Sequence, residues 1–588
     1  MRLLSAALVT LAFCTGGGGL LTQPSAQATA QTRQRVEIRR ALSMKPLKIG
    51  DVTMTRLIDS VILEHDGTLL YCDSAYVNQE NNSFDAYGHV RIVGKGSHIE
   101  GSALYYNGVT KDGRIVGGPV QMVDEENGTQ LWTDLLFFNS ESSTAHFITG
   151  GRVESPDYRV TSQRGYYVST PSRTAFAGDV VIQGKDANVV SDSVELYRHS
   201  GELHFFRHTR IHQDESFLYG DSGRYDRDVK RLQVLSNASF RKGANMIFAD
   251  YLEFDQPTGH ALARGRTVVV DSSGDTRLYS QYMELWQQEG KVMATQSPMI
   301  YSVDSSSARA DTLYLRADTL LAWRDTALRR DGLTGRQVVD SIRCGRALHA
   351  VRAYSFGQQA VADSMYYNGK DSTISLYRAP DSYLWMNDMQ TYAKSIVGYV
   401  GENRLDSARF TGDVFVAQQD GVTTYNQING QSVSATLDST GIRFVRIRGD
   451  GKVIFFMRDE GKLIGVNKVT APGFNVWMEN NAIQNVSFYK NPKSDVIPYK
   501  DAQMEDKMLP GFTWNDSLRP KSKEEIIPKW IVDLTFYQER RAAIKSWEAL
   551  DNAIFAIPWE SGTSKIPALP KFPNEKEKKT ERASPSVE

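Results

Sequence analysis

The segment Phe84-Asp85-Ala86-Tyr87-Gly88-His89-Val90-Arg91-Ile92 is followed, after a short polar interval, by Ile99-Glu100-Gly101-Ser102-Ala103-Leu104-Tyr105-Tyr106. Every second residue of the first segment is apolar or small, from Phe84 to Ile92, and this period of two is typical of a half-buried strand. Gly94, Gly96 and Ser97 predict a turn between the two segments. We therefore expect a pair of antiparallel strands that buries one apolar face.

This two-strand unit recurs along most of the chain in two interleaved series. In the first series an Asp-like residue precedes apolar residues at +2 and +4, and it occurs at Asp73, Gly101, Asp134, Gln163, Asp192, Asp221, Asp250, Gln281, Asp311 and Asp363. In the second series a small residue precedes an apolar strand, at Gly88, Gly118, Gly151, Gly178, Asn237, Gly265, Gly412 and Gly449. Two strands in every ~29 residues, repeated many times, indicate an array of stacked units.

Each unit can bury its apolar face only against neighbouring units and an opposing sheet. The sequence therefore predicts an all-β fold, an elongated array of stacked antiparallel strands with a continuous apolar interior. A strand spacing of ~4.8 Å and about fifteen repeats predict a rod on the order of 140 Å long. Cys72 and Cys344 would then lie much further apart than the ~7 Å that a disulfide allows, so we expect two unpaired, buried cysteines.

Four regions are predicted along the chain. Residues 1–28 have a basic start, an apolar run and small residues at a cleavage site, which together indicate a signal peptide. Residues 29–320 and 321–490 are expected to form two β-repeat domains, and the charged, turn-rich stretch 319–345 predicts a long loop or a junction, with a hinge left open. Residues 491–588 form an extension that is expected to be partly helical and then disordered.

The Asp-Ser and Asp-Thr pairs of the first series, such as Asp73-Ser74 and Asp192-Ser193, are interpreted as strand-entry turns in which the polar side chain bonds local backbone. The same pairs are similar to O-glycan acceptor motifs of exported Bacteroidota proteins, and glycosylation of one or two exposed sites is left open.

Composition and motifs argue against several classes of function. Without residues 1–28 the charge balance is 67 − 69 = −2, so no general attraction to nucleic acid is expected. The chain has no metalloprotease, phosphate-loop or nucleophile-elbow motif, and we predict no catalytic residue, no metal site and no cofactor. His204, His208 and His212 are expected to lie on a solvated strand face.

The apolar face is the candidate functional surface. It serves either as plain core or as a groove for acyl chains, because small residues along it either bring the sheets together or leave room for a guest. The predicted groove residues are Phe84, Ala86, Val90, Ile92, Ala103, Tyr105, Val120, Met122, Leu136, Phe138, Phe176, Val180, Ile182, Val194, Leu196, Leu252 and Phe254. Two alternatives stay open, a β-solenoid enzyme acting on polysaccharide and a surface scaffold or adhesin with a dry core.

The segment 86–92 with 99–106, and the segment 176–182 with 191–197, resemble the repeat of the OstA-like family. This family includes the periplasmic lipopolysaccharide-transport protein LptA and the N-terminal domain of the outer-membrane translocon LptD, and the length of the chain is similar to that of the long Bacteroidota members. The resemblance implies a β-jellyroll or taco-shaped array that holds lipid A acyl chains in its groove, in the periplasm, with outer-membrane association left open. It also implies inner- and outer-membrane transport components as partners, and head-to-tail self-association through exposed terminal strands.

Overall fold

A computed structural model describes residues 35–49, 52–65, 67–94, 96–125, 128–168, 173–185, 187–197, 200–243, 245–271, 275–304, 311–330, 337–401, 405–438, 441–479 and 482–556. Strands make up 72% of the structure and helices 5%, and the strand pairings are antiparallel. The chain is therefore all-β, as the repeat predicts. The predicted signal peptide and the predicted disordered tail beyond residue 556 lie outside the described residues.

The described residues divide into two compact units, and the first comprises those up to Lys242 together with those from Thr535 onward. Its elements are β1 (Glu37–Arg40), β2 (Ser43–Ile49), β3 (Val52–His65), β4 (Thr68–Asn78), β5 (Ser83–Gly94), β6 (Ser97–Tyr106), β7 (Asp112–Asp124), β8 (Thr129–Asn139), β9 (Thr144–Phe147), β10 (Gly151–Glu154), β11 (Tyr158–Ser162), β12 (Arg164–Val168), β13 (Arg173–Gly184), β14 (Asn188–Tyr197), β15 (Glu202–Gln213), β16 (Ser216–Asp226), β17 (Arg231–Ser236), β18 (Ala238–Lys242) and helix α2 (Gln538–Phe555).

The second unit is Gly243–Leu534. Its elements are β19 (Asn245–Ala249), β20 (Tyr251–Asp255), β21 (His260–Val270), β22 (Thr276–Trp286), β23 (Lys291–Thr295), β24 (Met299–Asp304), β25 (Asp311–Arg316), β26 (Thr319–Arg330), β27 (Gln337–Ser355), β28 (Gln358–Asn368), β29 (Thr373–Met386), β30 (Met389–Val400), β31 (Leu405–Gln419), β32 (Tyr425–Asp438), β33 (Gly441–Asp459), β34 (Lys462–Glu479), β35 (Ala482–Phe488), β36 (Lys493–Pro498), the short helix α1 (Met504–Lys507) and the 3₁₀ turn η1 (Lys523–Glu525).

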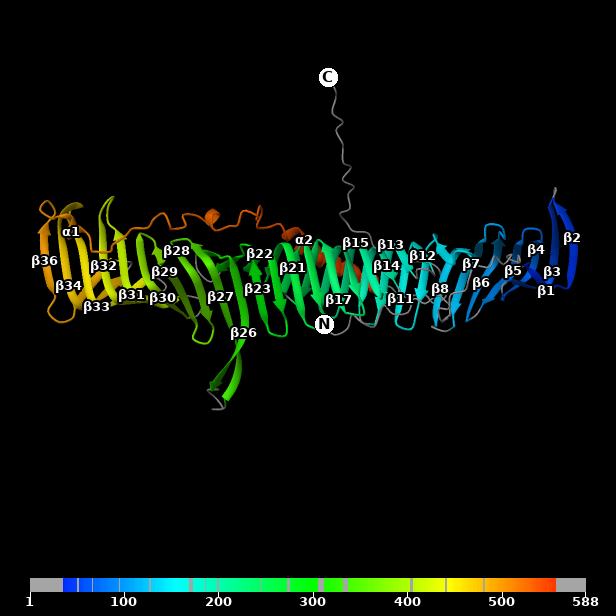
Figure 1. The fold of residues 1–588 in the computed structure, drawn as a ribbon, viewed down its shortest axis with the longest axis horizontal. Helices are drawn as coiled ribbons and strands as arrows, with labels where there is room; N and C mark the ends of the chain where they lie inside the picture. The colour runs from blue at the N-terminus through cyan, green and yellow to red at the C-terminus, as the bar shows by residue number, and fades with distance from the viewer. Residues whose placement is uncertain are drawn as a thin grey trace, which may run out of the picture. The chain divides into compact units, whose positions relative to one another are not determined.

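In each unit most strands are hydrogen-bonded to the strand that follows them in sequence (Figure 1), and many of the long strands bend near their middle. The bend is a register shift, such as the one between Tyr87 and Val90, where β5 has one residue more than β6. Where the bend is sharper the strand is divided, so that β9 and β10 both pair with β8. The two halves of each strand form two walls with the apolar side chains between them, which is the taco-like arrangement.

The bends explain the two sequence series. Gly88 and His89 form the bulge with φ of 74° and 42°, and Asp73 of the preceding strand accepts a hydrogen bond from His89 Nδ1 at 2.8 Å. The same contact at a separation of sixteen residues joins the pairs Gln163–Asp179, Asp192–His208, Asp221–Asn237 and Asp250–Arg266. The interpretation of the Asp-Ser pairs as strand-entry turns is therefore wrong for Asp73 and Asp192, which lie inside β4 and β14.

Replacing Gly88 with alanine is expected to destabilise the protein more than replacing Gly67. Both residues have φ near 75°, but a Cβ at Gly67 meets nothing within 4 Å, whereas a Cβ at Gly88 lies 2.9 Å from the Cβ of Asp73. The left-handed backbone costs about 1–2 kcal/mol with a side chain, so this amount is expected for Gly67→Ala and a larger loss for Gly88→Ala. Chemical denaturation measures the difference, and equal losses would contradict the close packing of the bend.

In the first unit, α2 packs on the outer face of one wall. Asp551 is fully buried and accepts hydrogen bonds from Arg210 at 2.9–3.1 Å and from His212 at 2.7 Å. The Trp547 ring stacks on Tyr219 with ring centroids 4.4 Å apart. His212 is therefore covered by α2, and its prediction as a solvated side chain is wrong.

In the second unit, residues 499–534, here called the strap, run back along the strands from β34 towards β22 (Figure 1). The order of the contacts shows the direction. Gln427 of β32 bonds to Lys507 and Leu509, Arg519 donates to Gln359 of β28, and the hydroxyl of Tyr279 of β22 donates to the Leu534 carbonyl at 2.8 Å. The partly helical extension of the prediction is thus a segment packed on strands.

Three further expectations can be compared with the structure. Within the stretch 319–345 the described residues 319–330 and 337–345 are not a loop, because Thr319 to Arg330 of β26 pairs continuously with β27. The domain boundary predicted at residues 320–321 falls inside the second unit, and the units divide at residues 242–243. Cys72 and Cys344 are unpaired and buried, as predicted.

Burial raises the pKa of the Cys72 thiol to about 11, with the nearby Asp73 charge adding to the effect. The thiolate is the reactive form, so Cys72 in the folded protein is expected to resist iodoacetamide at pH 8 and to react once the protein is denatured. Because the thiol ionises more readily in the unfolded chain, its contribution to stability is expected to fall between pH 9 and 11. Mass spectrometry of the iodoacetamide-treated protein tests the expected resistance of Cys72, and rapid labelling of this residue under native conditions would contradict it.

Candidate functional site: an apolar cavity in the second unit

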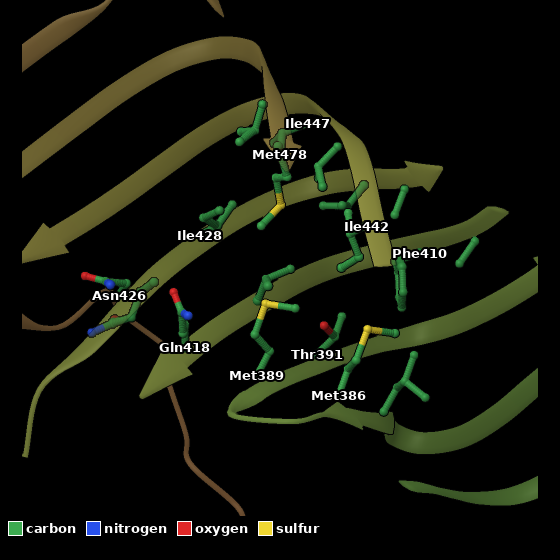
Figure 2. Close-up of a pocket in the computed structure, with 18 of the residues that line it drawn as sticks. Met386, Met389, Thr391, Phe410, Gln418, Asn426, Ile428, Ile442, Ile447 and Met478 are labelled. Atoms are coloured by element: carbon green, nitrogen blue, oxygen red, sulfur yellow. The ribbon is translucent and has the colours of Figure 1, made fainter. Parts of the chain in front are cut away.

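The strands β29 to β34 enclose an empty volume of about 1110 Å³, part of which is open to solvent (Figure 2). Of the residues that line it, four carry polar uncharged side chains, the others are apolar, and none is charged. They are Leu384, Met386, Met389, Thr391, Leu405, Ala408, Phe410, Val416, Gln418, Asn426, Gln427, Ile428, Val433, Ala435, Leu437, Ile442, Val445, Ile447, Val453, Ile454, Phe455, Val476 and Met478. An uncharged cavity with this lining suits a mostly apolar ligand.

The cavity lies between the two walls of the bent strands. On the first wall, directly opposed residues form the row Leu384, Thr391, Val416, Ile428 and Val453. On the second wall, beyond the bends, the rows Phe410–Val433–Ile447 and Ala408–Ala435–Val445 are built in the same way. Since directly opposed residues share one face of a sheet, the pairing alone brings these side chains together.

Small side chains on the second wall leave the space open. Ala408 and Ala435 are cross-strand partners and both line the cavity. Alanine fills less of the gap between the walls than the leucines and phenylalanines of a closed core. Met386, Met389 and Met478 also line the cavity, and methionine adapts its shape to a guest more readily than branched side chains do.

The strap covers the reverse face of the first wall. The hydroxyl of Tyr392 donates to the Gly511 carbonyl at 3.0 Å and accepts from the Thr513 amide at 3.1 Å, and burial raises its pKa. Gln427 donates to the Lys507 carbonyl and accepts from the Leu509 amide. Because Gln427 stands between the cavity residues Asn426 and Ile428, the strap holds the wall that lines the cavity.

The groove residues predicted from the sequence lie almost entirely in the first unit, and most are buried. Thirteen of the seventeen are buried, namely Phe84, Ala86, Val90, Ala103, Val120, Leu136, Phe176, Val180, Ile182, Val194, Leu196, Leu252 and Phe254. Ile92, Tyr105, Met122 and Phe138 are half-buried. Met122, Leu136 and Phe176 line a smaller cavity of about 350 Å³, while Leu252 and Phe254 belong to the second unit.

Ala103 and Tyr105 do not face the interior with Phe84 and Ala86. Phe84 and Ala86 oppose Tyr106 and Leu104, whereas Tyr105 opposes Asp85. The centroid of the Tyr105 ring lies 5.8 Å from that of the Tyr87 ring. The register shift between Glu100 and Ala103 inverts the alternation of interior and exterior side chains in β6. A strict period of two, continued past the shift, therefore assigns Ala103 and Tyr105 to the wrong face. Leu104 and Tyr106 are the interior residues of this strand.

Sequence reasoning missed the whole cavity of the second unit. The segment 382–457 matched the repeat only loosely, so its apolar residues were not assigned to the groove. A usable signal was present, because Ala408 and Ala435 are small residues at interior positions of adjacent strands. The sequence does not show that the walls stay apart there.

The histidines of the first unit form no common site. His204 contacts Glu202, His208 contacts Asp192, and His212 contacts Asp551. Across the described ranges, no cluster of three or more His, Cys, Asp or Glu side chains could hold a metal ion. Nor does any helix among those ranges have the length and apolar character needed to cross a membrane.

The fold of each unit is a β-taco, in which bent strands surround an apolar interior. Residues 33–192 and 169–288 each match the family model described as OstA-like protein, so the region 33–288 is OstA-like, in agreement with the resemblance noted from the repeats. This is a family of binding and transport proteins. The comparison with curated proteins gave no match.

Proposed function

We propose that the protein binds lipopolysaccharide in the periplasm, without catalysis, and carries its acyl chains towards the outer membrane. The observation that carries the proposal is the uncharged cavity between β29 and β34. Each methylene moved from water into such a cavity gains ~0.8 kcal/mol, so several chains suffice for firm binding. The proposal extends to the smaller cavity of the first unit and to the predicted groove residues around it.

Exposed strands support the part of the proposal that concerns partners. The residues of β36 are largely exposed, Val496 to 62%, and β36 pairs with β34 on one side. In the first unit β2 pairs with β3, and both Met44 of β2 and the preceding Leu42 are exposed. Such edges accept a further strand, either from a second copy in head-to-tail association or from inner- and outer-membrane transport components.

A photo-crosslinking experiment tests the proposal. The photoreactive residue benzoylphenylalanine in place of Ile428 is expected to crosslink to lipopolysaccharide, because Ile428 lines the cavity. The same residue in place of Val180, which is 0% exposed and lines neither cavity described above, is the matched control and should not crosslink. If neither position crosslinks and mass spectra of the purified protein show no lipid, the scaffold with a dry core is favoured.

A further inference from the structure

Two amide side chains stand side by side at the rim of the largely apolar cavity. Gln418 and Asn426 are cross-strand partners, and they continue the row of Met386 and Met389, which lie at the strand ends next to solvent. Both are half-buried and both line the cavity (Figure 2). When the acyl chains of a bound lipid lie deeper between the walls, the junction between these chains and the polar part of the lipid therefore lies next to the two amides.

The contacts of the two amides fix their orientation. Asn426 Oδ1 accepts the hydrogen bond of the Phe456 amide at 2.9 Å, so its Nδ2 is the atom left for a guest. Gln418 Nε2 donates to a carboxylate oxygen of Asp388 at 3.1 Å, so its Oε1 is left for a guest. Within the described part of the chain these two remaining atoms have no protein partner, and together they offer one donor and one acceptor.

We propose that Gln418 and Asn426 select acyl chains whose head end carries a group that both accepts and donates a hydrogen bond, namely a secondary amide or a hydroxylated ester. The carbonyl of such a group accepts from Asn426 Nδ2, and its N–H or O–H donates to Gln418 Oε1. A simple ester satisfies only Asn426. This inference rests on the proposed function, because it names the class of acyl lipid that the same cavity takes.

The test compares two lipids that differ in one atom, N-ethylhexadecanamide and ethyl hexadecanoate, by displacement of a fluorescent fatty acid from the full-length protein. A hydrogen bond to Gln418 Oε1 is expected to give the amide roughly fivefold tighter binding than the ester. The ester of the matching hydroxy acid forms a third arm. Its affinity distinguishes a preference for the amide alone from a preference for any donor.

Two variants separate the roles of the amides. Gln418→Met keeps the length of the side chain and removes the acceptor, so the amide and the ester should then bind equally. Asn426→Asp keeps the oxygen that accepts from the Phe456 amide and removes the donor, so both lipids should bind more weakly with their ratio unchanged. Circular dichroism and thermal denaturation show whether each variant is folded.

The outcomes distinguish this inference from the proposed function. Equal binding of amide and ester by the unaltered protein, or a preference that persists in Gln418→Met, would overturn the selection and leave the lipid cavity intact. Failure of all three lipids to displace the probe would overturn both. A preference that disappears only in Gln418→Met supports the assignment.

Discussion

Replacing Asp551 with alanine is expected to lower the stability of the first unit by about 3–5 kcal/mol, the loss found when one partner of a buried ion pair is removed. The Asp551 side chain is 0% exposed and that of Arg210 8%, so the variant leaves the guanidinium buried without its carboxylate. Helix α2 is then expected to detach from the wall. Chemical denaturation measures the loss, and limited proteolysis detects the detached helix.

Glu548 provides a matched control on the same helix. It pairs with Arg241, and both side chains are 22% exposed, so Glu548→Ala should cost no more than about 1 kcal/mol. The double variant Asp551→Leu/Arg210→Met leaves no unpaired charge between these two positions and is expected to recover most of the stability. If Asp551→Ala and Glu548→Ala had equal effects, the buried pair would not be what holds α2.

Replacing Ala435 with phenylalanine is expected to abolish most lipid binding and to leave the fold intact. Ala435 lines the cavity opposite the first wall, so a ring there occupies space that acyl chains need. The exclusion of about four methylenes costs ~3 kcal/mol of binding, or roughly a hundredfold in affinity. Displacement of a fluorescent fatty acid and thermal denaturation together measure both effects.

Ala86 is the control for this substitution. It is also a small interior residue, but it is 0% exposed and lines neither cavity described above. Ala86→Phe should therefore lower stability by about 1–3 kcal/mol through overpacking, and lipid binding in the second unit should persist. The prediction would be wrong if Ala435→Phe unfolded the protein or left lipid binding unchanged.

The fold was largely predictable because the repeat in the sequence marks both the strands and the bends within them. Gly88 and Asp73 belong to two separate sequence series, and the structure joins them at one bend. The faces of strands were less predictable, since a register shift near Ser102 reverses the alternation that identifies interior residues. Tyr105 was misassigned for this reason alone.

The site was less predictable than the fold. Ala86 and Ala435 have the same pattern of apolar neighbours and are both buried, yet only Ala435 lines the cavity of the second unit. The difference depends on the separation of two walls, which no local pattern encodes. The contact between Asp551 and Arg210 spans 341 positions of sequence, so a single sequence gives no sign of it.

The docking of α2 also bears on how the chain matures. Because its partners in β15 and β16 come more than three hundred residues earlier, α2 can reach them only after all the residues between them have been made. Until then Tyr219 and the neighbouring buried ring of Phe217 lack their cover, and exposed apolar surface of this kind promotes aggregation during folding. A chain that has not yet reached α2 is therefore expected to bind a chaperone through this exposed apolar surface.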